Sequence, residues 1–269
     1  PYTRRFLIDV GIRSGLEFPN KDEVHYSELK PANVDVVLSK WYIDIEVDSR
    51  SGFPSVETAD KPITAWTVYD GERYITGIQR SDLIDKSIRI GNWIIIACSS
   101  EEKLLFRLSK LIAKHDPDIL IGWNIENFDV PYLIRRCKKL GVHFDLSRLE
   151  VFDLLEGYKR LFKQPSYALK RVAVYEGILD ISEAVLGDVS DWYEKDLKRF
   201  IEYNKTDVEI LVKLDEKHSI TSFYQRLREV SGVPHLRDTY FSSIMIDTLL
   251  LRIAKEMNVV LPSKPEVIE

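Results

Sequence analysis

The stretch Tyr42-Ile43-Asp44-Ile45-Glu46-Val47 is the part of this sequence that says most about its fold. Apolar and acidic residues alternate in it, and side chains along a β-strand point to alternate faces, so the pattern predicts a strand within residues 36–47. The two isoleucines then share one face and the two acids the other. We expect this strand near the centre of a sheet, where buried carboxylates need polar partners or a metal ion.

A second acidic segment, residues 121–132, reads IGWNIENFDVPY. Asn124 can donate and accept hydrogen bonds, Phe128 can offer a face for stacking on a base, and Asp129 falls at the start of a predicted helix. A helix-capping loop is the simpler interpretation, because an acid stabilises the first turn of a helix. Capping explains Asp129 but not Asn124 and Phe128 together.

A third segment pairs Tyr203 with Asp207, four residues apart and therefore on one face of a predicted helix. Taken alone, the pair could equally be a surface tyrosine and aspartate among Lys205 and Glu209. Taken with the first two segments, it completes four acids and a tyrosine. Carboxylates suit Mg2+, and two such ions about 3.5 to 4 Å apart assist in-line attack on a phosphodiester, so the set is typical of two-metal phosphodiesterases.

Composition limits the class of protein. The chain has 269 residues, of which 45% are hydrophobic and 30% charged, as expected for one large globular domain or two smaller ones. Its net charge of -5 argues against non-specific coating of duplex DNA, but allows weak binding of a single-strand end in a groove. Cys98 and Cys137 are expected to be reduced, with no disulfide or zinc site. The longest apolar stretch, residues 93–98, is too short to span a membrane, so we expect an intracellular protein.

The remaining pattern predicts an α/β fold with a mixed sheet. The Asp70-Gly71 pair is a strong hairpin signal between two of the strands, and Ser99 or Ser100 is expected to cap the first long helix. Strands are expected over residues 6–10, 63–69, 74–79, 93–98 and 118–123, and helices over 101–115, 130–140 and 191–214, with two or three more between 216 and 257.

These segments resemble the 3'-5' exonuclease domain of family B DNA polymerases, and the resemblance covers most of the chain. Residues 42–47 followed by Gly52-Phe53-Pro54 are similar to the first exonuclease motif of that family, residues 116–136 to the second and residues 203–207 to the third. The resemblance implies a ribonuclease H-like fold, a mixed β-sheet flanked by helices and followed by a helical extension.

The resemblance also implies a domain organisation. Residues 1–35 would be the tail of an upstream N-terminal domain, 36–215 the exonuclease domain, and 216–269 a helical segment leading toward a polymerase palm. The residues with which the family polymerises nucleotides are absent from this sequence. The implied activity is proofreading, the hydrolysis of the 3'-terminal phosphodiester of single-stranded or mispaired DNA.

The family's mechanism implies roles for the residues that match its motifs. Asp44, Glu46 and Asp207 would hold the metal ion that activates the attacking water. Asp44 would bridge to a second ion, with Asp129 acting through water, and Tyr203 would orient the nucleophile. The implied cofactors are two divalent ions, Mg2+ or Mn2+.

The implied partners follow from the same resemblance. Asn124 and Phe128 would bind the terminal nucleotides of a single-stranded DNA 3' end. The polymerase palm, fingers and thumb would be supplied by sequence missing here, and a sliding clamp is a further candidate partner. No membrane is expected. In a prokaryote or archaeon, the protein would be cytoplasmic and associated with the nucleoid.

Two alternatives use the same fold. One is a free-standing exonuclease that trims DNA or RNA ends; against it, residues 216–264 resemble polymerase connecting structure. The other is a non-catalytic DNA-binding or assembly module. Against that stand five intact site residues, for which a module without activity has no physical need: Asp44, Glu46, Asp129, Tyr203 and Asp207.

Overall fold

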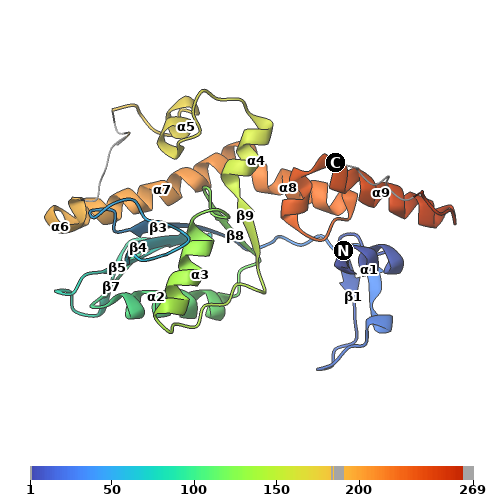
Figure 1. Ribbon diagram of the computed structural model, residues 1–269, viewed down its shortest axis with the longest axis horizontal. Coiled ribbons are helices and arrows are strands. Elements are labelled where there is room, and N and C mark those ends of the chain that lie inside the picture. Colours follow the sequence, from blue (N-terminus) through green and yellow to red (C-terminus); the bar gives the residue numbers. More distant parts are fainter. Residues whose placement is uncertain (1, 183, 185–190, 263–269) are drawn as a thin grey trace. The chain divides into compact units, whose positions relative to one another are not determined.

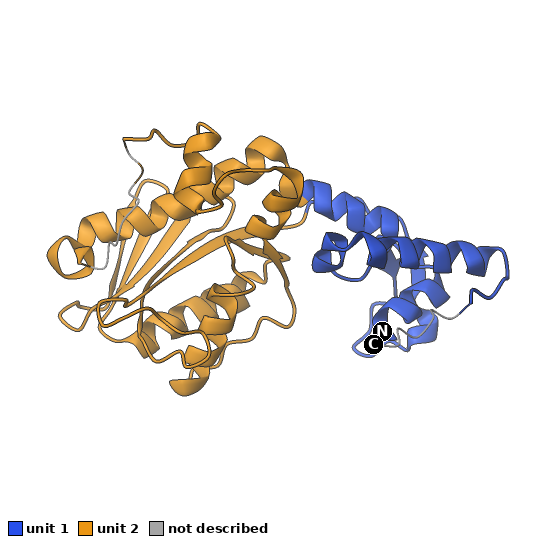
Figure 2. Cartoon of the chain, turned by 45° about the horizontal axis from the view of Figure 1, so that its top comes forward, with its two compact units in different colours: residues 1–37, 222–269 blue, residues 38–221 orange. Residues whose placement is uncertain are grey.

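The computed structural model describes residues 2–182, 184 and 191–262, and the chain divides into two compact units (Figure 2). The larger unit comprises residues 38–221 and contains all three acidic segments. The smaller unit combines residues 1–37 with 222–269.

The larger unit is built on a mixed sheet that has seven strands among the described residues (Figure 1). The strand order is β6-β7-β5-β4-β3-β8-β9. Pairing is parallel for β7/β5, β3/β8 and β8/β9, and antiparallel for the other neighbours. This confirms the predicted α/β class. The strands are β3 Lys40–Val47, β4 Ile63–Tyr69, β5 Tyr74–Gln79, β6 Lys86–Ile90, β7 Trp93–Cys98, β8 Ile119–Gly122 and β9 Glu150–Asp153.

Helices cover both faces of this sheet, with α2 and α3 on one side and α7 along the other (Figure 1). Ser100 caps α2 as predicted, its side chain accepting a hydrogen bond from the Lys103 backbone. The predicted helix over 191–214 is two helices, because the chain breaks at Asp196, whose carboxylate caps the second. The helices are α2 Glu101–His115, α3 Asp129–Lys139, α4 Leu154–Leu161, α5 Leu169–Tyr175, α6 Trp192–Lys195 and α7 Leu197–His218.

Strand β3 lies inside the sheet, between β4 and β8. Ile43 and Ile45 are 1% and 6% exposed and belong to the core beneath α2 and α3. The prediction of a strand from residue 36 was wrong by four residues. Val36 and Val37 are exposed, and pairing with β8 starts at Lys40.

Two further differences have simple causes. Strand β6 was not predicted, because it is an edge strand in which every residue is exposed, so burial imposes no pattern on it. The Asp70-Gly71 hairpin is confirmed between β4 and β5, with Asp70 Oδ1 accepting from the backbone of Arg73 at 2.7 Å. Cys98 and Cys137 are buried and free, as expected.

Close packing between β4 and β5 depends on Gly77. A Cβ added there would lie 2.4 Å from the ring of Trp66, which is fully buried and donates its indole hydrogen bond to the Leu104 carbonyl. We expect Gly77→Ala to lower the free energy of unfolding by about 1 to 3 kcal/mol through overpacking. Urea denaturation measures this. Ser87→Ala on exposed β6 is the control, and an equal effect of both changes would contradict the packing argument.

The smaller unit contains helix α1 (Tyr2–Val10), a two-stranded sheet of β1 (Gly15–Glu17) and β2 (Lys30–Ala32), and most of α8 (Ile220–Ser231) with all of α9 (Ser242–Glu256). The expected strand over residues 6–10 was wrong, since these residues end α1. Short apolar runs suit either structure, and here Arg5 and Asp9 pair at helical spacing. Buried Arg252 of α9 donates to the carbonyls of Ile12 and Gly232 and so ties this unit together. Two single-turn 3-10 helices, Tyr26–Glu28 and Leu236–Tyr240, complete it.

Candidate active site

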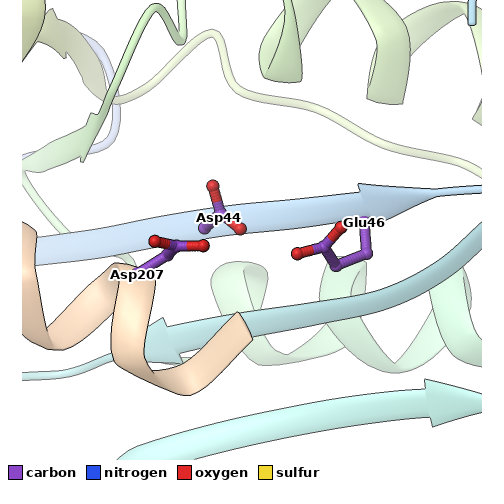
Figure 3. A group of neighbouring side chains, drawn as sticks. All are labelled: Asp44, Glu46 and Asp207. Carbon is purple, nitrogen blue, oxygen red and sulfur yellow. The ribbon is translucent and has the colours of Figure 1, made fainter. Parts of the chain in front are cut away.

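Three of the predicted acids converge between the sheet and α7 (Figure 3). Asp44 and Glu46 project from β3 and Asp207 from α7, each offering a carboxylate oxygen within 4.8 Å of the others. The alternation of β3 explains this for Asp44 and Glu46, because the residues that alternate with the buried isoleucines face the opposite side of the sheet. The predicted grouping of these three carboxylates is therefore present in the metal-free molecule.

Burial raises the pKa of each of these acids, and repulsion from neighbouring acids adds to it for Asp44 and Glu46. Burial is the largest cause for all three. The pKa of Glu46 rises to about 8, with repulsion from Asp207 adding to burial and the charge of Lys170 opposing it. The pKa of Asp44 is raised well above its usual value, with Asp207 as the next cause after burial. A group of three such carboxylates strongly favours a positive charge beside it.

Lys170 supplies one such charge and was missed by sequence reasoning. It lies on α5, is buried, and forms an ion pair with Asp207 while its ammonium sits 4.3 Å from the centre of the Tyr203 ring. The hydroxyl of Tyr203 also hydrogen-bonds to Asp207 and lowers the pKa of that acid. A lysine within a short helix belongs to no recognisable motif. The one sequence signal is its spacing of three residues from Ala173, which places both on the buried face of the helix.

Asp129 stands apart from the three grouped acids but is attached to the same strand. It is buried at the start of α3, and its Oδ1 accepts a hydrogen bond of 3.3 Å from the Ile45 backbone. Burial raises the pKa of Asp129 to about 7, and backbone hydrogen bonds act in the other direction. Its charge also raises the pKa of Asp44. Asp129 therefore influences the site electrostatically but does not belong to the group of three carboxylates within 4.8 Å of one another.

Asn124 and Phe128 lie in the loop that leads into α3. Asn124 has the left-handed backbone conformation, with φ of 61°, and its side chain accepts from Asn127 at 3.0 Å. Phe128 is half-buried, with its ring 5.5 Å from that of Tyr132. Buried Asp153, also missed from sequence, fixes the loop by accepting from the Asn124 backbone at 3.0 Å. Both residues therefore have structural contacts in addition to any contact with substrate.

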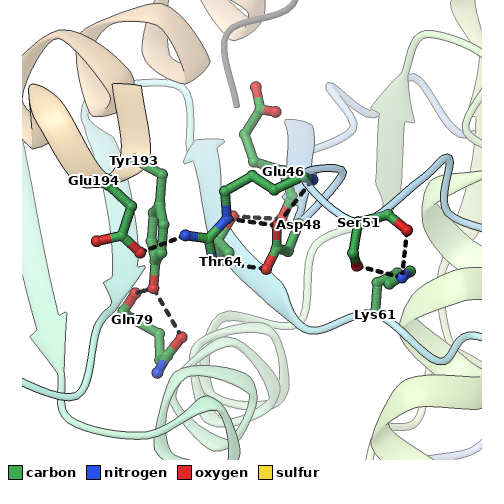
Figure 4. Close-up of polar contacts among 9 residues, drawn as sticks. Glu46, Asp48, Ser51, Lys61, Thr64, Gln79, Tyr193 and Glu194 are labelled. Carbon is green, nitrogen blue, oxygen red and sulfur yellow. Dashed lines mark hydrogen bonds and ion pairs between the residues drawn. The ribbon is translucent and has the colours of Figure 1, made fainter. Parts of the chain in front are cut away.

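A polar cluster continues from the end of β3 toward α6 (Figure 4). Arg50 binds Asp48 through two hydrogen bonds of 2.9 and 2.8 Å, pairs with Glu194, and stacks 5.2 Å from the centre of the Tyr193 ring. The Tyr193 hydroxyl donates to the Gln79 carbonyl at 2.5 Å. These residues line a polar cavity of about 680 Å3. The cluster ties α6 to strands β3 and β5 next to Glu46.

Comparison with known proteins identifies the family. Residues 1–204 match the model of the DNA polymerase family B exonuclease domain. This chain belongs to that family. The family B exonuclease domain described here is 31% identical to DNA polymerase 1 of Pyrococcus abyssi, over 99% of this chain and 34% of the relative. It is 28% identical to a DNA polymerase of Thermococcus kodakarensis, over 99% of this chain and 16% of the relative. It is 29% identical to the DNA polymerase delta catalytic subunit of Dictyostelium discoideum, over 87% of this chain and 26% of the relative.

The chain thus spans about a third of the length of the Pyrococcus abyssi relative. The part of those polymerases that lies outside the match is accordingly the larger part. Within the residues that the structure describes, no helix has both the length and the apolar character that crossing a bilayer requires.

The donor set of this exonuclease domain fits the divalent metal use that its family implies. All three grouped residues offer carboxylate oxygens, the ligands preferred by hard cations such as Mg2+ and Mn2+. Divalent charge would relieve the repulsion that, in addition to burial, raises the pKa values of Asp44 and Glu46. Asp44, Glu46 and Asp207 can therefore bind a metal ion.

Metal should stabilise this domain more at high pH than at low pH. Glu46, with a pKa of about 8, and Asp129, with about 7, are neutral in the metal-free fold at pH 6. In the unfolded chain their pKa values are about 4, so the metal-free fold loses stability as the pH rises from about 4 to about 8. Bound metal stabilises the ionised carboxylates and so offsets this loss. We expect saturating Mn2+ to raise the melting temperature more at pH 8.5 than at pH 6. Equal shifts at the two pH values would contradict this.

Proposed function

We propose that this domain is a 3'-5' exodeoxyribonuclease, the proofreading portion of a family B DNA polymerase. Its substrate is the 3' end of single-stranded or mispaired DNA. The observation that carries the proposal is the grouping of Asp44, Glu46 and Asp207 within 4.8 Å, in a family whose members include whole DNA polymerases. The geometry suits attack on a phosphodiester, because three carboxylates at this spacing can gather cations at the scissile phosphate.

Two Mg2+ or Mn2+ ions, held by Asp44, Glu46 and Asp207 with Asp129 beside them, would supply positive charge for the attacking water and for the leaving 3' oxygen. Water oxygen forms a bond to phosphorus as the bond from phosphorus to the 3' oxygen breaks, which releases a nucleoside 5'-monophosphate. The 3' oxygen gains a proton and becomes the new strand terminus.

Tyr203 orients the attacking water in this proposal. Burial and the neighbouring charge of Asp207 raise the pKa of the phenol well above its ordinary value, so the hydroxyl stays protonated. It can therefore donate and accept hydrogen bonds but cannot serve as the base. Asn124 and Phe128 bind the terminal nucleotides, and stacking on Phe128 suits an editing enzyme because every base has a π-face.

The domain organisation and partners belong to the same proposal. Residues 36–215 form the exonuclease domain, 1–35 the end of an N-terminal domain, and 216–269 the helical connection toward the palm. The partners are a DNA 3' end, the palm, fingers and thumb of the polymerase, and a sliding clamp. In a prokaryote or archaeon, such a protein works at the nucleoid.

Degradation of 5'-labelled single-stranded DNA tests this function. The domain is incubated with Mg2+, Mn2+ or chelator, beside Asp44→Ala and, as a surface control, Asp82→Ala. We expect a ladder that shortens from the 3' end, requires metal, persists in Asp82→Ala and disappears in Asp44→Ala. Absence of cleavage with either metal would instead favour a non-catalytic module on this fold.

A further inference from the structure

A buried row of polar side chains runs across the sheet to Asp44. Asp44, Thr67 and Thr76 are directly opposite one another on β3, β4 and β5. Asn204 of α7 lies against this row, and its Nδ2 donates to Asp44 Oδ2 at 2.6 Å. Its Oδ1 accepts from the Thr67 hydroxyl at 2.5 Å. Asn204 and both threonines are fully buried, so the bonds among these three residues are made away from water, while the bond to Asp44 is part-buried.

The direction of each bond in the row can be deduced from its two ends. The indole nitrogen of Trp93 on β7 lies 2.9 Å from Thr76 Oγ1, and an indole can only donate. The Thr76 and Thr67 hydroxyls are 2.8 Å apart. Since the single Thr67 hydrogen is committed to Asn204, the Thr76 hydroxyl must donate to Thr67. All the hydrogens therefore point from Trp93 toward Asp44.

The carboxylate of Asp44 fixes the orientation of the Asn204 amide. Its carbonyl faces a hydroxyl donor and its amino group faces a carboxylate, whereas the flipped amide would place its oxygen against the carboxylate oxygen of Asp44. The amino group also approaches the Asp44 backbone carbonyl at 3.4 Å. A chain of aligned bonds strengthens each member in a low dielectric, so the last bond, to the carboxylate, gains most from the arrangement.

We propose that Asn204 is a positioning residue, which holds the Asp44 carboxylate in the orientation that metal binding requires and is itself held by the relay through Thr67 and Thr76. The inference rests on the proposed metal-dependent function. Asn204 is completely buried and cannot touch DNA, so its effect reaches the reaction through the acids it contacts, Asp44 and also Glu46, whose pKa its hydrogen bond lowers. Partners that orient a metal ligand commonly contribute about 10- to 100-fold to metal affinity.

Calorimetric titration of the metal-free protein with Mn2+, without DNA, tests this positioning role. Asn204→Leu keeps the side-chain size but removes both hydrogen bonds, and we expect its Kd for Mn2+ to rise about 10- to 100-fold. In the DNA assay, kcat should fall at saturating substrate while KM for DNA stays unchanged. A Kd within about twofold of wild type would overturn the proposal, even if the melting temperature falls.

Two variants of Thr67 test the relay one bond further from the metal ligand Asp44. They also test the proposal if Asn204→Leu does not fold. Thr67→Val keeps the shape and removes the hydroxyl, so we expect weaker Mn2+ binding, by less than in Asn204→Leu. Thr67→Ser restores the hydroxyl and should restore the affinity. Equal Kd values for the two variants would overturn the relay. A wild-type protein that binds no Mn2+ would overturn the proposed function as well, which separates the two failures.

Discussion

Replacing Asp44 by asparagine is expected to remove activity and yet stabilise the metal-free protein. A metal site supplies several kcal/mol of transition-state stabilisation, and about 4 kcal/mol corresponds to a 10^3-fold loss of rate. At the same time, the raised pKa of Asp44 means that its ionised form destabilises the metal-free fold as the pH rises above about 4. A neutral amide lacks that penalty, so the free energy of unfolding of the metal-free protein should rise by at least about 1 kcal/mol at pH 8.

Two measurements on Asp44→Asn check this pair of effects: the rate of DNA cleavage in Mn2+, and urea denaturation in chelator at pH 8. Asp82→Asn is the control, since Asp82 is exposed and binds Arg80 at the surface. It should change neither quantity appreciably. A variant with reduced stability in chelator would contradict the argument that ionisation of this buried acid destabilises the metal-free fold.

Replacing Arg136 by alanine is expected to be the most destabilising single change outside the site, at about 3 to 5 kcal/mol. The side chain of Arg136 is 14% exposed and that of Glu101 is 9% exposed, and the two are joined by hydrogen bonds of 2.7 and 2.6 Å. Glu101 also accepts from the Ile63 backbone, so the pair joins α3, α2 and the start of β4. Without Arg136, the carboxylate of Glu101 is left buried and lacks its cation.

The control for Arg136 is the pair of Arg148 and Asp116, whose side chains are 79% and 51% exposed. Arg148→Ala should cost about 0 to 1 kcal/mol, because solvent screens an exposed pair. Urea denaturation of both variants measures the difference. Similar costs would mean that burial of the Arg136 pair contributes nothing. Because α3 begins at Asp129, Arg136→Ala should also disturb the placement of that acid.

Periodicity made part of the site predictable. The alternation around Asp44 and Glu46 places both on one face of a strand, and the helical spacing of Tyr203 and Asp207 places them on one face of a helix. The resemblance to the family predicted that these two elements lie together. The mixed sheet followed from strands whose burial imposes a pattern, whereas the exposed strand β6 carried none.

The roles of Lys170 and Asn204 could not be predicted from the sequence. Their importance comes from what they touch, and those partners are remote in sequence: Asp44 precedes Asn204 by 160 residues. A lysine or asparagine in a helix has many uses, and composition does not separate them. The strand predicted over residues 6–10 was wrong for another reason. A short apolar run is compatible with a helix or a strand, and the flanking residues determine which one forms.

The long separation between β3 and α7 has a consequence for how the protein is made. A ribosome completes Asp44 and Glu46 early, and the sheet strands through β9 follow, but Asp207 emerges only after them. Domains form as their residues become available during synthesis. Until α7 has emerged and packed, a nascent chain has only two of the three grouped ligands. A truncated product that ends before residue 207 would therefore lack the complete group of three carboxylates.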